Sequence, residues 1–161
     1  MNQVSAVCPK DSKFEGNIRD TITLDFDSRR RRRIKLTTDG GIEFLLNLQE
    51  VKTLRDGDIL LLDDGSGIIV RAKGEPVADI RSPNMAHLVR VAWHLGNRHL
   101  PTELMADRMR IRQDHVIEEM LARLGAIVER LDAPFNPEGG AYGHGETEGH
   151  DHGPSHGHSH G

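Results

Sequence analysis

The chemistry that this sequence offers most clearly is metal coordination by histidine. Segment 136–161 holds six of the ten histidines of the chain, with eight glycines and no lysine or arginine. The neutral imidazole is a good nitrogen ligand for nickel, copper or zinc near pH 7. Several of these side chains are two residues apart on a backbone loosened by glycine, so they can converge on one ion. The six histidines of this segment are His144, His150, His152, His156, His158 and His160.

This histidine-rich tail is predicted to be disordered, because Ala141 and Tyr142 are its only apolar side chains and cannot bury enough surface to order it. Its metal sites would form on binding and be adaptable rather than preorganised. An engineered affinity tag is the alternative interpretation. Such tags are usually unbroken histidine runs, whereas glycine, serine and acidic residues separate these histidines, as in natural histidine-rich tracts.

Two further histidines, His87 and His94, are seven residues apart on one predicted helix. Two helical turns separate them by about 10 Å, so they cannot chelate a single ion as an i, i+4 pair could. We expect both to be surface residues. His94 could still assist a nearby site.

The last two histidines are better placed for binding a ligand. His99 is predicted to lie in a loop between Gly96, which ends the first helix, and Pro101. His115 opens the second predicted helix beside Asp114, where the ring could project outward. The helix dipole disfavours imidazolium at that position, so the neutral ligand form is easier to reach.

Residues 1–75 are predicted to form a small all-β domain. From Thr21 to Asp27 apolar and polar side chains alternate, as in a half-buried strand. Glycine-aspartate turns separate further strand-like segments, and Gly74-Glu75-Pro76 marks the end of the domain. These segments are 34–37, 42–48, 59–62 and 68–72.

Residues 76–135 are predicted to form a ferredoxin-like βαββαβ domain, which gives the chain an α+β fold. A strand near Val77 precedes a helix from Pro83 to Leu95, with Ser82 as its N-cap and Met85 in its buried stripe. Two strands joined near Asp107, a helix capped by Asp114 and ended by Gly125, and a strand over 127–131 complete the order. The second helix is expected to bury Val116, Ile117, Met120, Leu121 and Leu124.

The charge balance argues against nucleic acid and acidic membranes as partners. Of 25 acidic residues four lie in the tail, which leaves 21 acids against 21 bases in the body. No apolar run approaches the roughly 20 residues that span a bilayer, and residues 1–10 lack a signal-peptide core. The one cysteine, Cys8, can form no internal disulfide. We therefore expect a cytoplasmic protein.

The arginine run 29–33, continued by Lys35, has three interpretations. In a strand, alternate arginines would point to opposite faces, some of them paired with Asp25 or Asp27. The run also suits a surface for a protein partner, or one for nucleic acid. The last is least favoured, because the chain has only six aromatic residues and a neutral body.

No motif for catalysis is present in the sequence. Gly65-Ser66-Gly67 is typical of a hairpin turn, and no phosphate-binding loop or nucleophile elbow occurs. We expect no enzyme activity, and nucleotide hydrolysis would have to come from a partner.

The segment His94-Leu95-Gly96-Asn97-Arg98-His99-Leu100-Pro101, followed by Asp114-His115-Val116 and by residues 120–125, resembles the UreE family of urease accessory proteins, the nickel metallochaperones of urease maturation. Residues 29–33, 55–58 and 70–75 are similar to the β domain of that family. The resemblance thus covers nearly the whole chain.

The resemblance implies an N-terminal domain similar to chaperone peptide-binding modules, a ferredoxin-like metal-binding domain and a homodimer. It implies that His99 binds Ni²⁺ at the dimer interface, where a two-fold axis would bring two copies of one histidine to one ion. His115 matches a position that supplies additional ligands. Gln113 stands where relatives often have a histidine, which puts that auxiliary site in question.

Three functions are compatible with the sequence. The first is a homodimeric nickel carrier that passes Ni²⁺ to apo-urease through a urease accessory GTPase. The second is a buffer whose tail stores nickel or zinc. The third is a peptide-binding folding helper, as in prolyl isomerases with histidine-rich tails. The affinity order of divalent metals places copper above nickel, so Zn²⁺ or Cu²⁺ could also bind in vitro.

Overall fold

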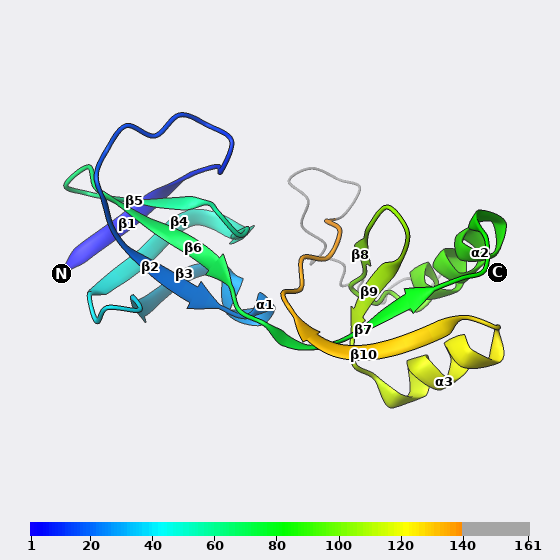
Figure 1. The fold of residues 1–161 in the computed structure, drawn as a ribbon. Coiled ribbons are helices and arrows are strands. Elements are labelled where there is room, and N and C mark those ends of the chain that lie inside the picture. The colour runs from blue at the N-terminus through cyan, green and yellow to red at the C-terminus, as the bar shows by residue number, and fades with distance from the viewer. Residues whose placement is uncertain (140–161) are drawn as a thin grey trace, which may run out of the picture.

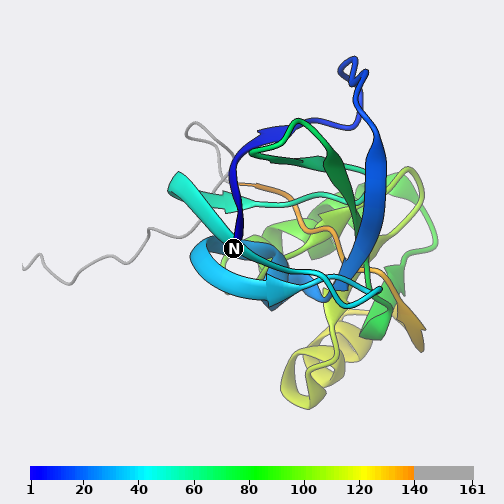
Figure 2. The ribbon, with the colours of Figure 1, turned by 90° about the vertical axis from the view of Figure 1, so that its left-hand side faces the viewer.

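The computed structural model describes residues 1–139, which form two units with one β-sheet each (Figures 1 and 2). The strands of the first sheet are β1 (Asn2–Cys8), β2 (Ile18–Leu24), β3 (Arg30–Thr37), β4 (Glu43–Thr53), β5 (Ile59–Leu62) and β6 (Gly67–Ala72). Those of the second are β7 (Glu75–Arg81), β8 (Glu103–Leu104), β9 (Met109–Arg112) and β10 (Ile127–Ala133). The helices are α1 (Phe26–Arg29), α2 (Met85–Gly96) and α3 (His115–Arg123). Within residues 1–139, none of the helices has both the length and the apolar character needed to cross a membrane.

The N-terminal sheet has the strand order β2-β6-β5-β1-β4-β3 and is mixed, with parallel pairs β1/β4 and β2/β6. Alternate side chains such as Val4, Leu46 and Ile68 are fully buried in its core. The predicted strands over 34–37, 59–62 and 68–72 lie within β3, β5 and β6. β1 was not predicted.

The strand expected to continue to Asp27 ends at Leu24, so this prediction was wrong. The Asp25 side chain accepts a hydrogen bond from the Ser28 amide at 2.9 Å, which caps the short helix α1. A carboxylate at this position competes with strand pairing because it satisfies a helical N–H group.

The C-terminal sheet confirms the ferredoxin-like prediction. Its strand order is β10-β7-β9-β8 and all neighbouring pairs are antiparallel, as in that arrangement. The two longer helices pack on one face of the sheet. The buried residues of this core include Ala78, Ile80, Met109 and Ile111 from the strands and Val91, Leu95, Ile117 and Leu121 from the helices.

Three details of the helices differ from the predictions. α2 begins at Met85 rather than Pro83, because the side chain of Asn84, not Ser82, accepts the amide of His87 at 2.8 Å. Met85 is 61% exposed and Val116 is 69% exposed, so neither belongs to a buried stripe. Sequence periodicity identified these helices correctly, but contact with the sheet decides which apolar residues face it.

The opposite face of the C-terminal sheet carries a buried ion pair. The Asp79 carboxylate accepts hydrogen bonds from Arg110 at 2.6 and 3.1 Å and from Arg108 at 2.9 Å. Burial alone would raise the pKa of Asp79, but these guanidinium donors outweigh it and hold the pKa below the usual value. The pair joins β7 to β9 on the face away from the helices.

Arg29 is fully buried where the two units meet, which corrects the expectation of a strand face with Asp25 or Asp27 as partner. Its guanidinium donates to the carbonyl oxygens of Leu24, Leu54 and Phe135 and to Asn136 Oδ1. Asp27 instead pairs with Arg112, at 2.9 Å.

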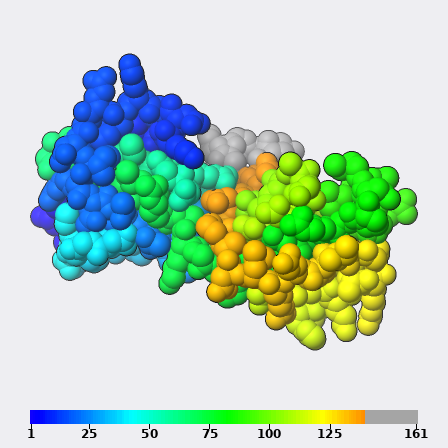
Figure 3. All heavy atoms as spheres, in the orientation of Figure 1, coloured from blue at the N-terminus to red at the C-terminus, as the bar shows by residue number. Residues whose placement is uncertain are grey.

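Residues 134–138, which we name the strap, contact both units (Figure 3, orange atoms where the two lobes meet). Phe135 is fully buried and meets the ring of Phe26 edge to face at 5.5 Å, with the Arg112 guanidinium over both rings. Arg110 and Arg55 donate to the carbonyls of Pro134 and Pro137. The strap ends where the Glu138 amide donates to Thr102 O at 2.7 Å.

Candidate metal-binding site

His99 lies in the loop that follows α2, as predicted, and its side chain is exposed. Its φ of 54° makes it the one non-glycine residue with positive φ among residues 1–139. A non-glycine residue in the left-handed region costs of order 1 kcal/mol or more and is often retained at functional sites. This backbone conformation therefore marks His99 independently of its side-chain chemistry.

The residues around His99 hold the loop in place. The Asn97 amide donates to carbonyls of the last turn of α2, and the His99 amide donates to Gly96 O at 3.2 Å. On one side of His99, Arg98 reaches the sulfur of Met120 on α3 at 3.1 Å. On the other side, Leu100 packs against the core of the C-terminal unit. The loop is thus anchored on both sides of an exposed imidazole.

His115 is the first residue of α3 and is exposed, as its position in the sequence predicted. Asp114 caps the helix, because its side chain accepts the Ile117 amide at 3.0 Å. Glu118 accepts a hydrogen bond from the amide of Asp114 at 2.8 Å in return, so the backbone N–H groups of Asp114 and Ile117 both have acceptors in this first turn. The helix start that carries His115 is therefore well defined.

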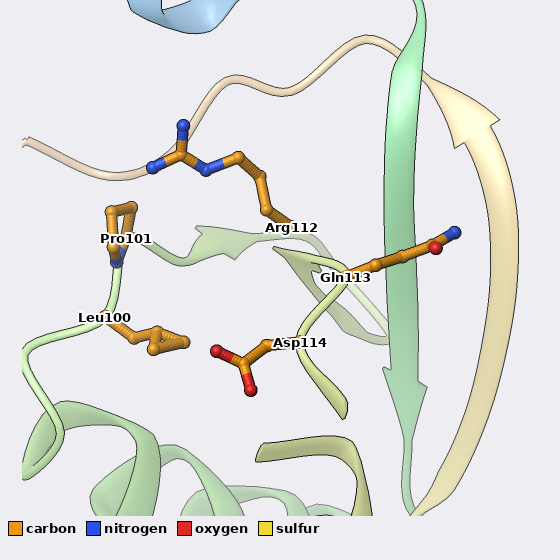
Figure 4. A pocket seen from close by; sticks show the side chains of 5 residues that line it. All are labelled: Leu100, Pro101, Arg112, Gln113 and Asp114. Atoms are coloured by element: carbon orange, nitrogen blue, oxygen red, sulfur yellow. The ribbon is translucent and has the colours of Figure 1, made fainter. Parts of the chain in front are cut away.

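A hollow of about 280 Å³ lies between the segments that carry these two histidines (Figure 4). Its lining residues are Leu100, Pro101, Arg112, Gln113 and Asp114. Leu100 and Pro101 directly follow His99, and Asp114 directly precedes His115. The fold thus brings two segments that are distant in sequence to one site on the surface.

Gln113 does not direct its side chain into this hollow. In Figure 4 the side chain extends toward β7, where Nε2 donates to Val77 O at 3.1 Å. A glutamine fixed to the backbone in this way offers no ligand beside His115.

The structure places His87 only partly at the surface, where it was expected. It is half-buried, and its Nε2 lies 2.7 Å from Leu124 O, so that the ring joins α2 to the end of α3. His94 is also half-buried and meets the Trp93 ring edge to face at 5.1 Å. Within the described part of the chain, no three histidine, cysteine or acidic side chains are grouped as a metal site. The predicted ligands His144, His150, His152, His156, His158 and His160 lie outside the described residues.

An exposed apolar stripe on α2 was missed by the sequence analysis. Met85, Val89 and Trp93 are 61%, 61% and 64% exposed and follow one another at i, i+4 spacing along the helix. They form a second stripe beside the buried Val91 and Leu95 and run toward the end of α2 that precedes His99. The i, i+4 spacing of Met85, Val89 and Trp93 was the available signal, since a helix with two apolar stripes buries only one against its own sheet.

Glu118 ties the start of α3 to β10 and supports a testable prediction. Arg130 donates to its carboxylate at 2.8 and 3.0 Å, which lowers the pKa of Glu118; burial opposes this, and the Asp114 amide lowers it further. Because the pKa of Glu118 is lower in the folded chain than in the unfolded chain, ionised Glu118 stabilises the fold at pH values above the unfolded-chain pKa of about 4.3. This contribution is lost as the pH falls through the folded-state pKa.

We expect Glu118→Gln to lower the free energy of unfolding by about 1 kcal/mol at neutral pH, a modest value because Arg130 is half exposed. The variant should also lose less stability than the parent below about pH 4.3. Urea denaturation at several pH values measures both effects. Glu119→Gln is the matched control, because Glu119 is exposed and 4.0 Å from its partner Arg123. Equal effects of the two substitutions would contradict a stabilising role of the Glu118–Arg130 ion pair.

The fold and the site together define a two-domain α+β protein in which a ferredoxin-like domain presents an exposed loop histidine. The family description "UreE urease accessory protein, C-terminal domain" matches residues 75–161, and the corresponding N-terminal domain matches residues 7–73. The chain belongs to the UreE family of urease accessory proteins.

Relatives named urease accessory protein UreE are similar over most of this chain. The protein from Chelativorans sp. (strain BNC1) is 53% identical over 137 residues, which cover 81% of this chain and 87% of that protein. Those from Bradyrhizobium sp. strains ORS 278 and BTAi1 are 57% and 53% identical, over 76% and 82% of this chain. The matches cover 59% and 65% of the two Bradyrhizobium proteins, so this chain spans about three fifths of their length. All three are named as accessory proteins of urease rather than as enzymes.

Proposed function

We propose that this protein is a nickel metallochaperone, which binds Ni²⁺ between the His99 side chains of two chains and delivers it to apo-urease during metallocentre assembly. The observation that carries the proposal is that His99 is exposed, has a left-handed backbone conformation and lies in a loop anchored on both sides. The names of the relatives support a role in urease maturation. The protein would act in the cytoplasm with a urease accessory GTPase as partner, and without catalytic activity of its own.

A homodimer would supply the metal ligands that the body of one chain lacks. The body of one chain offers His99, and at a distance His115, but no grouped set of three ligands within residues 1–139. Two-fold symmetry would bring both copies of His99 to one ion, and His115 directly follows Asp114, which lines the hollow. The stripe of Met85, Val89 and Trp93 offers an apolar face along α2 that runs toward the end nearest to His99. Burial of such a face is the usual driving force for association.

The strap supports a role of the tail as nickel collector. Glu138 is fixed to Thr102, three residues after His99 in the sequence. His144 follows Glu138 by six residues, which reach about 20 Å when fully extended. Tethering at this point raises the effective concentration of tail imidazoles at His99. Neutral imidazoles also exchange metal more readily than a thiolate cage would.

Nickel stoichiometry before and after removal of the tail tests the proposal against the storage alternative. The structure indicates where to truncate: after Gly139, since Asn136, Pro137 and Glu138 hold the strap. We expect the truncated dimer to keep about one Ni²⁺ and the full chain to bind several more. Isothermal titration calorimetry with elemental analysis measures both values. Loss of essentially all binding on truncation would overturn the carrier and favour a nickel or zinc buffer.

A further inference from the structure

We propose that a basic cluster on the N-terminal unit, formed by Arg31, Arg32, Arg33 and Lys52, is a docking surface for an acidic protein partner. The cluster lies on β3 and β4, apart from the helices and the loop that present the candidate metal site (Figure 1). The inference therefore does not depend on nickel binding, and it names the chemistry of a partner rather than of a metal.

The fold places the four basic residues on two neighbouring strands at one edge of the first sheet. β3 is the last strand in the order β2-β6-β5-β1-β4-β3, and Arg31 lies opposite Lys52 on β4. Ile34 and Leu36 of the same strand pack against the core, which fixes β3 while all four basic side chains remain exposed. The cluster is thus a property of an anchored strand and not of a loose loop.

Within residues 1–139, the charges of this cluster are largely uncompensated. Arg32 donates to Gln49 O and Arg33 to Asn47 Oδ1, both at 3.3 Å, and these acceptors are neutral. In the part of the chain that the structure describes, none of the four is ion-paired with a carboxylate. The exposed Glu50 on β4 leaves a net charge of about three positive units.

Other surface arginines show that ion pairs with carboxylates are common in this protein. Arg19 pairs with Asp64, Arg81 with Asp107 and Arg130 with Glu118. In the basic cluster, by contrast, like charges face each other across the strand pair at Arg31 and Lys52, which is unfavourable. An anionic partner would relieve this repulsion.

The composition of the two strands favours an acidic protein over nucleic acid. Single-stranded nucleic acids are held by aromatic side chains on which bases stack, but Phe44 is the only aromatic residue on β3 and β4 and it is fully buried. Val51, beside Lys52, is 43% exposed and adds apolar area. Arginine next to exposed apolar area is typical of protein interfaces.

Binding of a labelled peptide that alternates glutamate with threonine tests this surface. We expect the full-length protein to bind the peptide in fluorescence anisotropy at low salt, and the triple variant Arg31→Gln/Arg32→Gln/Arg33→Gln to bind about tenfold more weakly. The matched control is Arg71→Gln/Arg90→Gln/Arg123→Gln, which removes the same charge from exposed positions elsewhere and should bind like the parent. Nickel stoichiometry should be the same in all three proteins.

Three outcomes would overturn the proposal. The first is that the parent does not bind the peptide. The second is that the two triple variants weaken binding equally, since that would reflect net charge alone. The third is that an oligothymidylate of the same charge binds as tightly as the peptide and depends on the same three arginines, which would make the cluster a nucleic-acid surface.

Discussion

Replacing His99 by alanine in the chain that ends at Gly139 is expected to reduce bound nickel from about one ion per dimer to essentially none. In the proposed dimer each chain contributes this imidazole, so one substitution removes both central ligands. Neither His87 nor His94 can replace them, because His87 contacts Leu124 O and His94 packs against Trp93. Nickel affinity by calorimetry, with elemental analysis of the dialysed protein, measures the effect.

His94→Ala is the matched control, because it removes a histidine of the same α2 terminus and should leave the stoichiometry unchanged. His115→Ala should weaken binding without abolishing it, since this residue follows Asp114, which lines the hollow, and is offered only as an auxiliary ligand. Because protons compete with metal for imidazole, nickel affinity should also fall between about pH 8 and about pH 5. Full nickel binding by the His99 variant would place the ion elsewhere and refute the proposed site.

The largest stability effect is expected from Arg29→Met. The substitution keeps much of the aliphatic volume but removes every donor, which leaves the carbonyls of Leu24, Leu54 and Phe135 without their guanidinium partner. A buried acceptor that loses its donor costs about 1–3 kcal/mol, so we expect a total loss of about 3–5 kcal/mol in the free energy of unfolding. Burial lowers the pKa of Arg29, yet arginine remains charged, so no protonation change offsets this loss.

Urea denaturation followed by circular dichroism measures this loss. Arg31→Met is the control, because Arg31 belongs to the same run but is exposed, and its effect should stay within about 0.5 kcal/mol. Arg29→Lys should be intermediate, since an ammonium cannot span four acceptors placed for a planar guanidinium. A loss below about 1 kcal/mol for Arg29→Met would show that the strap does not depend on Arg29.

Local patterns in the sequence predicted much of the fold, because they act over one or two turns. Period-2 alternation located most strands of the first sheet, and Asp114 and Gly125 marked both ends of α3. The βαββαβ order followed from element types alone. Predictions failed where a polar side chain accepted a backbone N–H group and so set the start of a helix, as Asp25 does in α1 and Asn84 does at α2.

The sequence by itself determined the ferredoxin-like order, the loop position of His99 and the helix start at His115, since these depend on residues close together in the chain. Only the tertiary structure decided that Arg29 is buried and that a strap joins both units beside the His99 loop. It likewise showed that the segments carrying His99 and His115 border one hollow. Such features depend on contacts between residues up to about a hundred positions apart, and no local pattern encodes which distant carbonyl a guanidinium will meet.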